Sequence, residues 1–270
     1  MNTTELIRSR RSVRSFDGAA PDKELLDDIL RYAAAVETPY SLPIEWRVLD
    51  AKAQKLSCPV ITGTVTYIAG KLRREMHAEE AFGFAFERVV LYAVSKGLGT
   101  TWIAGTMDRP AFERAMGLGE GEVMPCVSPL GRPAAKMSLR ESMMRKGVKA
   151  DSRLSFEELF FSGGFDTPLT PDKAGEVREA LELVRLAPSA VNRQPWRAVV
   201  CDDTVHFYEK QGKGFVAANG WDIQKVDVGI ALCHFVCGME ERGRKTVLAI
   251  TDPGLPHPAD TVYIASIRIG

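Results

Sequence analysis

The most informative stretch of the chain reads Pro188-Ser189-Ala190-Val191-Asn192-Arg193-Gln194-Pro195-Trp196. Pro188 is expected to end the preceding helix, because proline cannot continue a helical hydrogen-bond ladder. Ser189, Asn192 and Gln194 then place polar side chains on an irregular loop before a strand. Asn and Gln each offer a donor and an acceptor, which suits a planar heterocycle with mixed edges. The alternative is an ordinary capped loop whose amides bond to the backbone.

This stretch belongs to an internal repeat. Two motifs recur at an offset of 150: Pro21-Asp22-Lys23 as Pro171-Asp172-Lys173, and Trp46-Arg47 as Trp196-Arg197. Three later residues recur at an offset of 146: Gly83, Gly97 and Thr100 as Gly229, Gly243 and Thr246. The collinear order indicates two tandem halves, which we place at residues 1–160 and 161–270.

Each half has the pattern of a helix, a strand, a long helix and a further strand. Helical spacing of apolar residues predicts four helices. Asp22 caps the first, and Gly97 ends the second, which covers residues 78–96. The other two cover residues 171–186 and 226–241. Strands are expected at 46–49, 100–104, 246–250 and 262–269, and at 123–130, where prolines break the strand. Strands at 197–201 and 205–208 are expected to form a hairpin that Asp202-Asp203 joins. Residues 132–155 have the composition of a polar linker. The fold class is therefore α+β with a mixed sheet flanked by helices.

The composition excludes several partners. Lys+Arg and Asp+Glu are both 35, so the zero net charge does not favour nucleic acid or an anionic membrane. No apolar run approaches the roughly 20 residues that span a bilayer, and the N-terminus lacks a secretory signal, so a cytoplasmic protein is expected. The five cysteines are scattered, and Cys233 and Cys237, four apart, are interpreted as buried apolar residues rather than as metal ligands.

Further chemistry is expected at Arg10-Arg11-Ser12-Val13-Arg14, because arginine forks bind phosphate bidentately and Ser12 adds a hydroxyl. A solvated basic helix start is the alternative. In the segment 97–105, Gly97 and Gly99 allow the backbone to pass close to a flat or crowded group, and the backbone N–H groups of Ala104 and Gly105 are available to an acceptor. The alternative is a helix C-cap followed by a core strand. More positive charge is available from Arg132 and Arg153.

These segments resemble landmarks of the nitroreductase superfamily. Residues 10–16 are similar to its N-terminal flavin-phosphate motif, and residues 188–196 are similar to its second motif. Residues 97–100, 131–133 and 153–158 resemble its later motifs. The resemblance implies FMN, which the family holds between two subunits. It also implies the following cofactor-binding residues: Arg10, Arg11, Ser12, Arg14, Thr101, Trp102, Ala104, Gly105, Arg132, Arg153, Pro188, Ser189, Ala190, Asn192 and Gln194.

By this resemblance, Arg10, Arg14 and Arg153 hold the phosphate, and backbone at 104–105 lies near flavin N5. One site is intact, with its motifs divided between the two halves. The complementary site is degraded, because residues 38–46 lack the Asn and Gln, and residues 160–165 contain no arginine. The two halves are therefore expected to pair with each other as an intramolecular pseudo-dimer. This arrangement is compatible with a chain that acts as a monomer.

The activity implied is hydride transfer from NAD(P)H through FMN to a nitroaromatic or quinone. No residue is assigned as a catalytic acid or base. Trp102 and Ala104 stand at positions where the family usually has charged or polar groups near the ring. The sequence therefore does not decide the substrate or the hydride donor. The alternatives are a protein that binds or stores flavin without turnover and a scaffold that has lost the cofactor.

Overall fold

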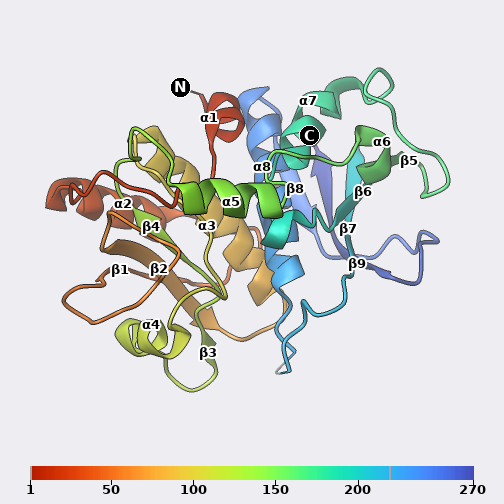
Figure 1. Cartoon of the computed structure of the whole chain (residues 1–270). Helices are drawn as coiled ribbons and strands as arrows, with labels where there is room; N and C mark the ends of the chain where they lie inside the picture. The colour runs from red at the N-terminus through yellow and green to blue at the C-terminus, as the bar shows by residue number, and fades with distance from the viewer. Residues whose placement is uncertain (1, 219) are drawn as a thin grey trace. The chain divides into compact units, whose positions relative to one another are not determined.

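The computed structural model describes residues 2–218 and 220–270 (Figure 1). Their contacts group them into two compact units, one of residues 9–78 and 85–149, the other of residues 2–8, 79–84 and 150–270. Helices and strands are interspersed along the chain, which confirms the α+β class. The division into halves at residue 160 stays a prediction.

The first unit contains an antiparallel sheet whose strand β2 pairs with β1, β3 and β4. The strands are β1 Glu45–Asp50, β2 Thr66–Arg73, β3 Glu122–Val123 and β4 Val127–Leu130. The helices that lie wholly or largely in this unit are α2 Lys23–Ala35, α3 Ala78–Ser95, α4 Arg109–Met116 and α5 Leu139–Gly147. Apolar residues from these elements form one buried core cluster, which includes Leu49, Tyr67, Phe112 and Val127.

Strand β2 was not anticipated, because it contains Gly70, which weakens a strand pattern. The structure gives the reason for this glycine. A Cβ at Gly70 would lie 2.6 Å from the indole of Trp46, which packs across the neighbouring strand. The indole also lies 5.6 Å from the ring of Phe86 on α3, so the missing side chain makes room for an aromatic contact between sheet and helix.

One predicted element of the first unit is corrected. Residues 100–104 do not form a regular strand; they make single bridges, Thr100 to Ser12 and Ile103 to Val127. The break predicted within 123–130 is confirmed: β3 and β4 are separated by a stretch that contains Pro125, which cannot donate to a ladder. The helix end at Gly97 is confirmed, with φ +81° and Leu98 N–H donating to the carbonyl of Ala93.

The expected linker at 132–155 is also more ordered than its composition indicates. It contains α5, whose N-terminus is capped by the Ser138 hydroxyl accepting the Glu141 N–H. Ser138 N–H in turn donates to Ser15 Oγ at 3.2 Å. A local cap and tertiary hydrogen bonds thus stabilise a segment whose helix buries no apolar side chain.

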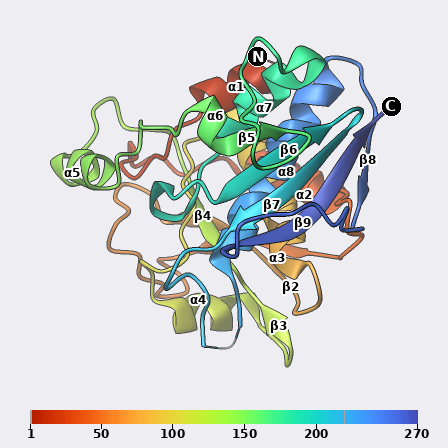
Figure 2. The same ribbon diagram turned by 90° about the vertical axis from the view of Figure 1, so that its right-hand side faces the viewer.

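The second unit contains a mixed sheet in the order β5-β6-β7-β9-β8, with β5 parallel to β6 and the other pairs antiparallel (Figure 2). The strands are β5 Phe160–Ser162, β6 Trp196–Cys201, β7 Thr204–Lys210, β8 Thr246–Ala249 and β9 Thr261–Ile269. The helices are α6 Phe156–Leu159, α7 Arg178–Arg185, α8 Ile223–Glu241 and most of α1 Thr3–Ser9. The predicted hairpin between β6 and β7 is confirmed and turns at Asp202, with φ +51°.

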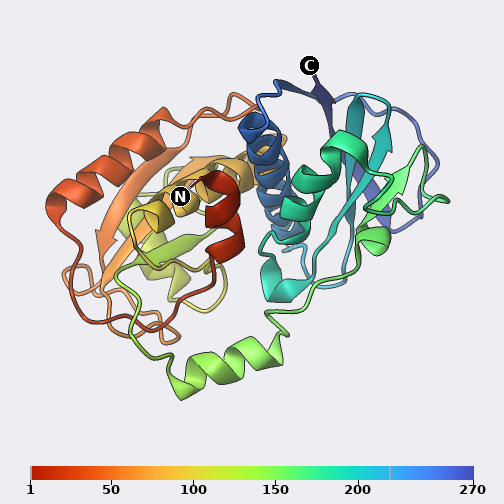
Figure 3. The same cartoon turned by 90° about the horizontal axis from the view of Figure 1, so that it is seen from above.

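Helices α7 and α8 lie side by side (Figure 3). A Cβ at Gly238 of α8 would lie 2.9 Å from Ala180 Cα, and His234 Nδ1 lies 2.8 Å from the Leu183 carbonyl oxygen. The prediction that the helix seen as α7 starts at Pro171 is wrong. A turn and the 3-10 segment Gly175–Val177 come first, and α7 begins only after Gly175, whose φ of +54° does not fit an α-helix.

The first turns of α3 pack closely against α8 within the second unit. A Cβ at Gly83 would lie 2.1 Å from the Val226 carbonyl oxygen, and a Cβ at Gly229 would lie 2.3 Å from the Glu80 carbonyl oxygen. Gly83 corresponds to Gly229, and Glu80 to Val226, at the repeat offset of 146. This reciprocity is what two copies of one surface produce about a twofold axis.

Across the described ranges, no helix is long and apolar enough for a membrane crossing. The same residues contain no group of three or more His, Cys, Asp or Glu side chains placed to hold a metal ion. Cys233 and Cys237 are buried, reduced cysteines whose sulfurs lie 3.9 Å apart. Their interpretation as buried apolar residues is confirmed.

The glycine contact gives a stability prediction. Gly83→Ala should lower the free energy of unfolding by about 1–3 kcal/mol, because its Cβ collides with backbone rather than with a movable side chain. Gly147→Ala is the matched control, since its Cβ meets nothing within 4 Å. Urea denaturation measures both. A Gly83→Ala protein as stable as the control would contradict the close approach.

Candidate functional site

A buried arginine lies at the centre of the N-terminal motif. The Arg10 side chain is 5% exposed and the Glu87 side chain is 0% exposed, with Arg10 Nε 3.8 Å from Glu87 Oε1. Among the described residues, Arg10 Nε and Nη1 have no hydrogen-bond partner. Burial lowers the pKa of Arg10, and the Glu87 charge opposes that shift. A buried guanidinium with unused donors is a binding element for an anion.

Glu87 links this arginine to the segment after α3. Its Oε2 accepts a hydrogen bond from Trp102 Nε1 at 2.9 Å. The neighbouring Thr101 is 1% exposed and donates its N–H to Ser128 Oγ at 3.1 Å. The hydroxyls of Thr100 and Thr101 have no hydrogen-bond partner in the described part of the chain. The hydroxyls of Thr100 and Thr101 are therefore available for hydrogen bonds in the segment next to Trp102.

The backbone around Ser12 is extended, which explains why the polar residues of the motif, Arg10, Ser12 and Arg14, stand at alternate positions. Ser12 bridges Thr100 in parallel, and Val13 N–H donates to the Thr100 carbonyl at 2.9 Å, so this segment runs in an extended conformation beside the Gly-Leu-Gly-Thr segment. Alternate side chains of an extended segment point the same way. Arg14 is half-buried; burial lowers its pKa, while the negative charge of Glu141 raises it.

Other predicted residues of the first unit are placed differently. Arg11, Gly105 and Arg132 are exposed. The Ala104 carbonyl accepts a hydrogen bond from Arg109 Nη2 at 2.6 Å, so this oxygen is used in fixing the loop before α4. Their roles toward a cofactor stay predictions.

The second motif forms a strained loop in the other unit. Val191, Asn192 and Gln194 have φ values of 44°, 58° and 52°, the left-handed region that side chains other than glycine rarely occupy. Ser189 Oγ accepts the Gln194 N–H at 2.9 Å, which closes the loop on itself. Non-glycine residues in this conformation cluster at ligand-binding sites.

The amides of this loop hold the segment before α6. Gln194 Oε1 accepts the Leu154 N–H at 2.9 Å, and Asn192 Nδ2 donates to the Ser152 carbonyl at 3.0 Å. Arg153 Nη1 lies 3.4 Å from Asn192 Oδ1 and donates to the carbonyls of Ser152 and Ala150. The structure thus brings Arg153 to the second motif, in the arrangement that the capped-loop alternative describes.

Pro188 and Ala190, the remaining predicted residues of the motif, are half-buried in the same loop. The N-terminal motif and this loop belong to different units. That they meet around one cofactor stays a prediction.

Two residues of this region were missed by the sequence analysis. Glu87 lies in the apolar helix α3, and Asp227 lies in the apolar helix α8, where both Asp227 oxygens accept the Ala190 N–H. The signal that could have found them is an acid within an apolar stretch of a long helix. Such residues are almost never buried without a partner.

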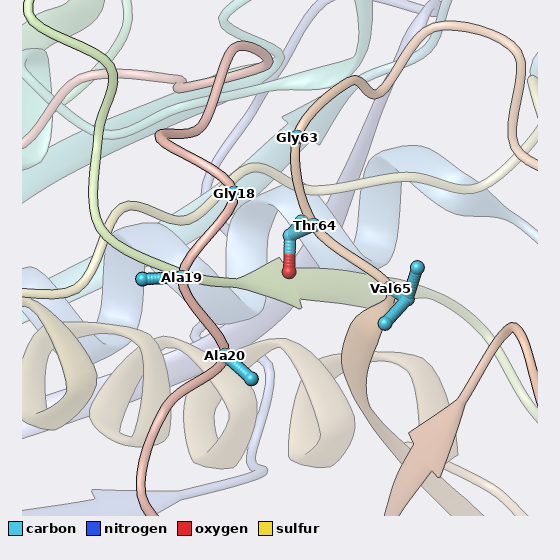
Figure 4. A pocket seen from close by; sticks show the side chains of 6 residues that line it. All are labelled: Gly18, Ala19, Ala20, Gly63, Thr64 and Val65. Atoms are coloured by element: carbon cyan, nitrogen blue, oxygen red, sulfur yellow. The ribbon is translucent and has the colours of Figure 1, made fainter.

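A pocket of about 280 Å³ opens in the first unit, between Gly18, Ala19 and Ala20 on one side and Gly63, Thr64 and Val65 on the other (Figure 4). Its six lining residues include no charged side chain. The Thr64 hydroxyl donates to the Leu130 carbonyl at 2.7 Å. This pocket therefore offers little chemistry, and the buried Arg10 is the stronger candidate site.

A further buried acid lies on β7 of the second unit. Glu209 is 0% exposed. Burial, with a smaller effect of the neighbouring Asp222 carboxyl, raises the pKa of Glu209 to about 8. The same two acids contribute to the raised pKa of Asp227, for which burial is the main cause. Acids therefore gather in the interior behind the second motif.

The family model described as "Putative TM nitroreductase" matches residues 2–239. The chain belongs to this nitroreductase family, which confirms the resemblance of its motifs. The crystal structure of a putative nitroreductase from Thermotoga maritima MSB8 shares the fold, with a TM-score of 0.65 and 21% identity over 99% of this chain and 94% of that one. No curated protein matches the chain.

Shorter solved proteins also match. A nitroreductase family protein from Clostridium novyi NT is 22% identical, with a TM-score of 0.43 over 50% of this chain and 87% of that one. An FMN-dependent nitroreductase from Clostridium difficile R20291 is 19% identical, with a TM-score of 0.42 over 51% of this chain and 92% of that one.

Glu209 gives a pH prediction. The folded chain keeps a proton on Glu209 that the unfolded chain releases above the ordinary value of 4.5, so stability from this group falls as the pH rises from about 4.5 through about 8. Glu209→Gln should therefore gain stability relative to the parent across that window, by up to about 1.4 kcal/mol per pH unit. Denaturation at pH 5.5, 7 and 8.5 measures it, with the exposed Glu24→Gln as control. A constant difference between Glu209→Gln and the parent would contradict the raised pKa.

Proposed function

We propose that the chain binds one FMN and is an oxidoreductase of the nitroreductase type. The observation that carries the proposal is the buried Arg10, whose Nε and Nη1 lack a hydrogen-bond partner in the described residues. A phosphate fits this donor set, because an ionised oxygen would compensate a charge that one carboxylate at 3.8 Å compensates only in part. Family membership supports the choice of a flavin phosphate over another anion.

The residues of the chain bind and orient the cofactor. Arg10 and Arg14 hold the phosphate, with Ser12 as a hydroxyl partner, and the Glu87 carboxylate compensates part of the Arg10 charge. Thr101 and Trp102 lie beside this phosphate site. The second motif contributes Ser189, Asn192 and Gln194 to the ribityl chain and ring edge, with Arg153 next to them. Arg11, Ala104, Gly105, Arg132, Pro188 and Ala190 complete the proposed set.

When bound, FMN supplies hydride acceptance from NADH or NADPH and electron donation to an electron-poor acceptor such as a nitroaromatic or quinone. The protein provides position and charge for that chemistry. We assign no catalytic acid or base. We further propose that the tandem halves keep one of two ancestral sites. The reciprocal contact of Gly83 and Gly229 supports the duplication, and a chain that carries both halves of the site is expected to act as a monomer.

The proposal is tested with the full chain. We expect purified protein to carry one FMN per chain, or to take it up, and to lose the oxidised flavin absorbance when NADH or NADPH is added without oxygen. Addition of a quinone or nitroaromatic should restore it. Flavin that neither nucleotide reduces would indicate a binding protein without turnover. Protein that takes up no FMN would overturn the proposal.

The phosphate site has its own variant. Arg10→Gln should weaken FMN binding by roughly 10- to 100-fold, because it removes a charge-assisted contact of about 1.5–3 kcal/mol. Arg31→Gln is the control, since the Arg31 side chain is 72% exposed. Titration of apoprotein by flavin fluorescence measures both affinities. Equal affinities of Arg10→Gln and the control would remove Arg10 from the site.

A further inference from the structure

The conformation of the 189–194 loop needs an external restraint. Val191, Asn192 and Gln194 are all in the left-handed region within four positions, and none is glycine. Each such residue costs free energy and persists only where surrounding contacts fix it. Two tethers come from the chain's own neighbourhood: Ser189 Oγ to Gln194 N–H, and Gln194 Oε1 to Leu154 N–H.

A third tether comes from helix α8. Asp227 is 4% exposed, and its Oδ1 and Oδ2 lie 3.1 Å and 3.0 Å from the Ala190 nitrogen, which donates to them. The N–H of Ala190 is the one directly before the left-handed turn. Asp227 thus joins the start of the loop to a helix that is buried along most of its length.

This carboxyl lies in unfavourable surroundings. It is flanked on α8 by the buried Val226 and Val228. Burial raises the pKa of Asp227, the charges of Asp222 and Glu209 raise it further, and the Ala190 hydrogen bond lowers it. A carboxyl group at this position has a desolvation cost that a small apolar residue would not have. Its presence is explained if its hydrogen bond to Ala190 is needed.

The repeat offers an internal comparison. At the offset of 146 the counterpart of Asp227 is Ala81, which is 0% exposed, and at the offset of 150 the counterpart of Ala190 is Tyr40. The first half has lost the Asn and Gln of the motif as well. The acid therefore accompanies the intact loop and is missing where the loop has changed.

We propose that Asp227 is a positioning residue for the cofactor site: it holds the Ala190 N–H and so fixes the left-handed turn that presents the second motif. The inference rests on the proposed function for its link to FMN, but its structural step does not depend on the cofactor. An acceptor oxygen at this position is required, and an asparagine can supply one through Oδ1.

The test compares Asp227→Ala, Asp227→Asn and Asp222→Ala in the full chain. Asp222 is the matched control: it is also 4% exposed, and it accepts the Gln224 N–H at the start of α8 rather than a loop amide. Hydrogen exchange read by mass spectrometry reports the loop without any ligand. FMN titration of each apoprotein reports the site.

We expect Asp227→Ala to speed amide exchange of the loop about tenfold, because the tether that opposes local opening is lost. We expect its FMN dissociation constant to rise at least about tenfold, as for a buried donor left unsatisfied. Asp227→Asn should restore both values to within about threefold of the parent. Asp222→Ala should affect exchange at the start of α8 and leave the FMN affinity within about threefold.

Each other outcome has a defined meaning. Unchanged loop exchange in Asp227→Ala overturns the inference, whatever the protein binds. Loss of FMN affinity in Asp222→Ala equal to that in Asp227→Ala would show a general loss of stability and also overturn it. If the parent binds no FMN, the proposed function fails, and the exchange data alone decide whether Asp227 positions the loop.

Discussion

Compensation of buried charge is the constraint on which the candidate site depends. Arg10 is removed from water with its Nε 3.8 Å from Glu87 Oε1, and among the described residues its Nε and Nη1 have no hydrogen-bond partner. Desolvation of a guanidinium is costly, so a fold that keeps it buried must gain from it elsewhere. Trp102 fixes the second Glu87 oxygen, which leaves that carboxylate little freedom to move. For the phosphate that we propose here, the donors would already be in place, and this preorganisation would reduce the cost of binding.

The second unit applies the same constraint with the opposite sign. Asp227 is buried among apolar residues of α8, and the backbone N–H of Ala190 is its partner. The loop amide is thereby restrained by a helix rather than by neighbouring loop residues. In both units a long helix carries a buried acid within an apolar stretch, and each of these acids contacts a group from one of the two family motifs. Rigid helices place these groups more reproducibly than loops do.

Several elements were predictable because their cause is local. The hairpin of β6 and β7, the end of α3 at Gly97 and the buried helix α8 follow from turn residues, a glycine cap and apolar composition. Other elements were not. Strand β2 contains a glycine that only the Trp46 indole explains, and α7 begins at Arg178 because Gly175 turns left-handed. The family motifs identified most of the candidate residues, whereas Glu87 and Asp227 were missed because neither belongs to a motif.

By itself, the sequence determined the α+β class, the family and its two motifs, because these are expressed in residue order and spacing. Tertiary structure decided how the motif residues are used. It buried Arg10 but left Arg11 and Arg132 exposed, and it engaged the Gln194 amide with the Leu154 backbone. Burial and hydrogen-bond partners come from segments that are distant in the chain. The spacing of a motif cannot specify which of its side chains loses contact with water, since that depends on what packs over it.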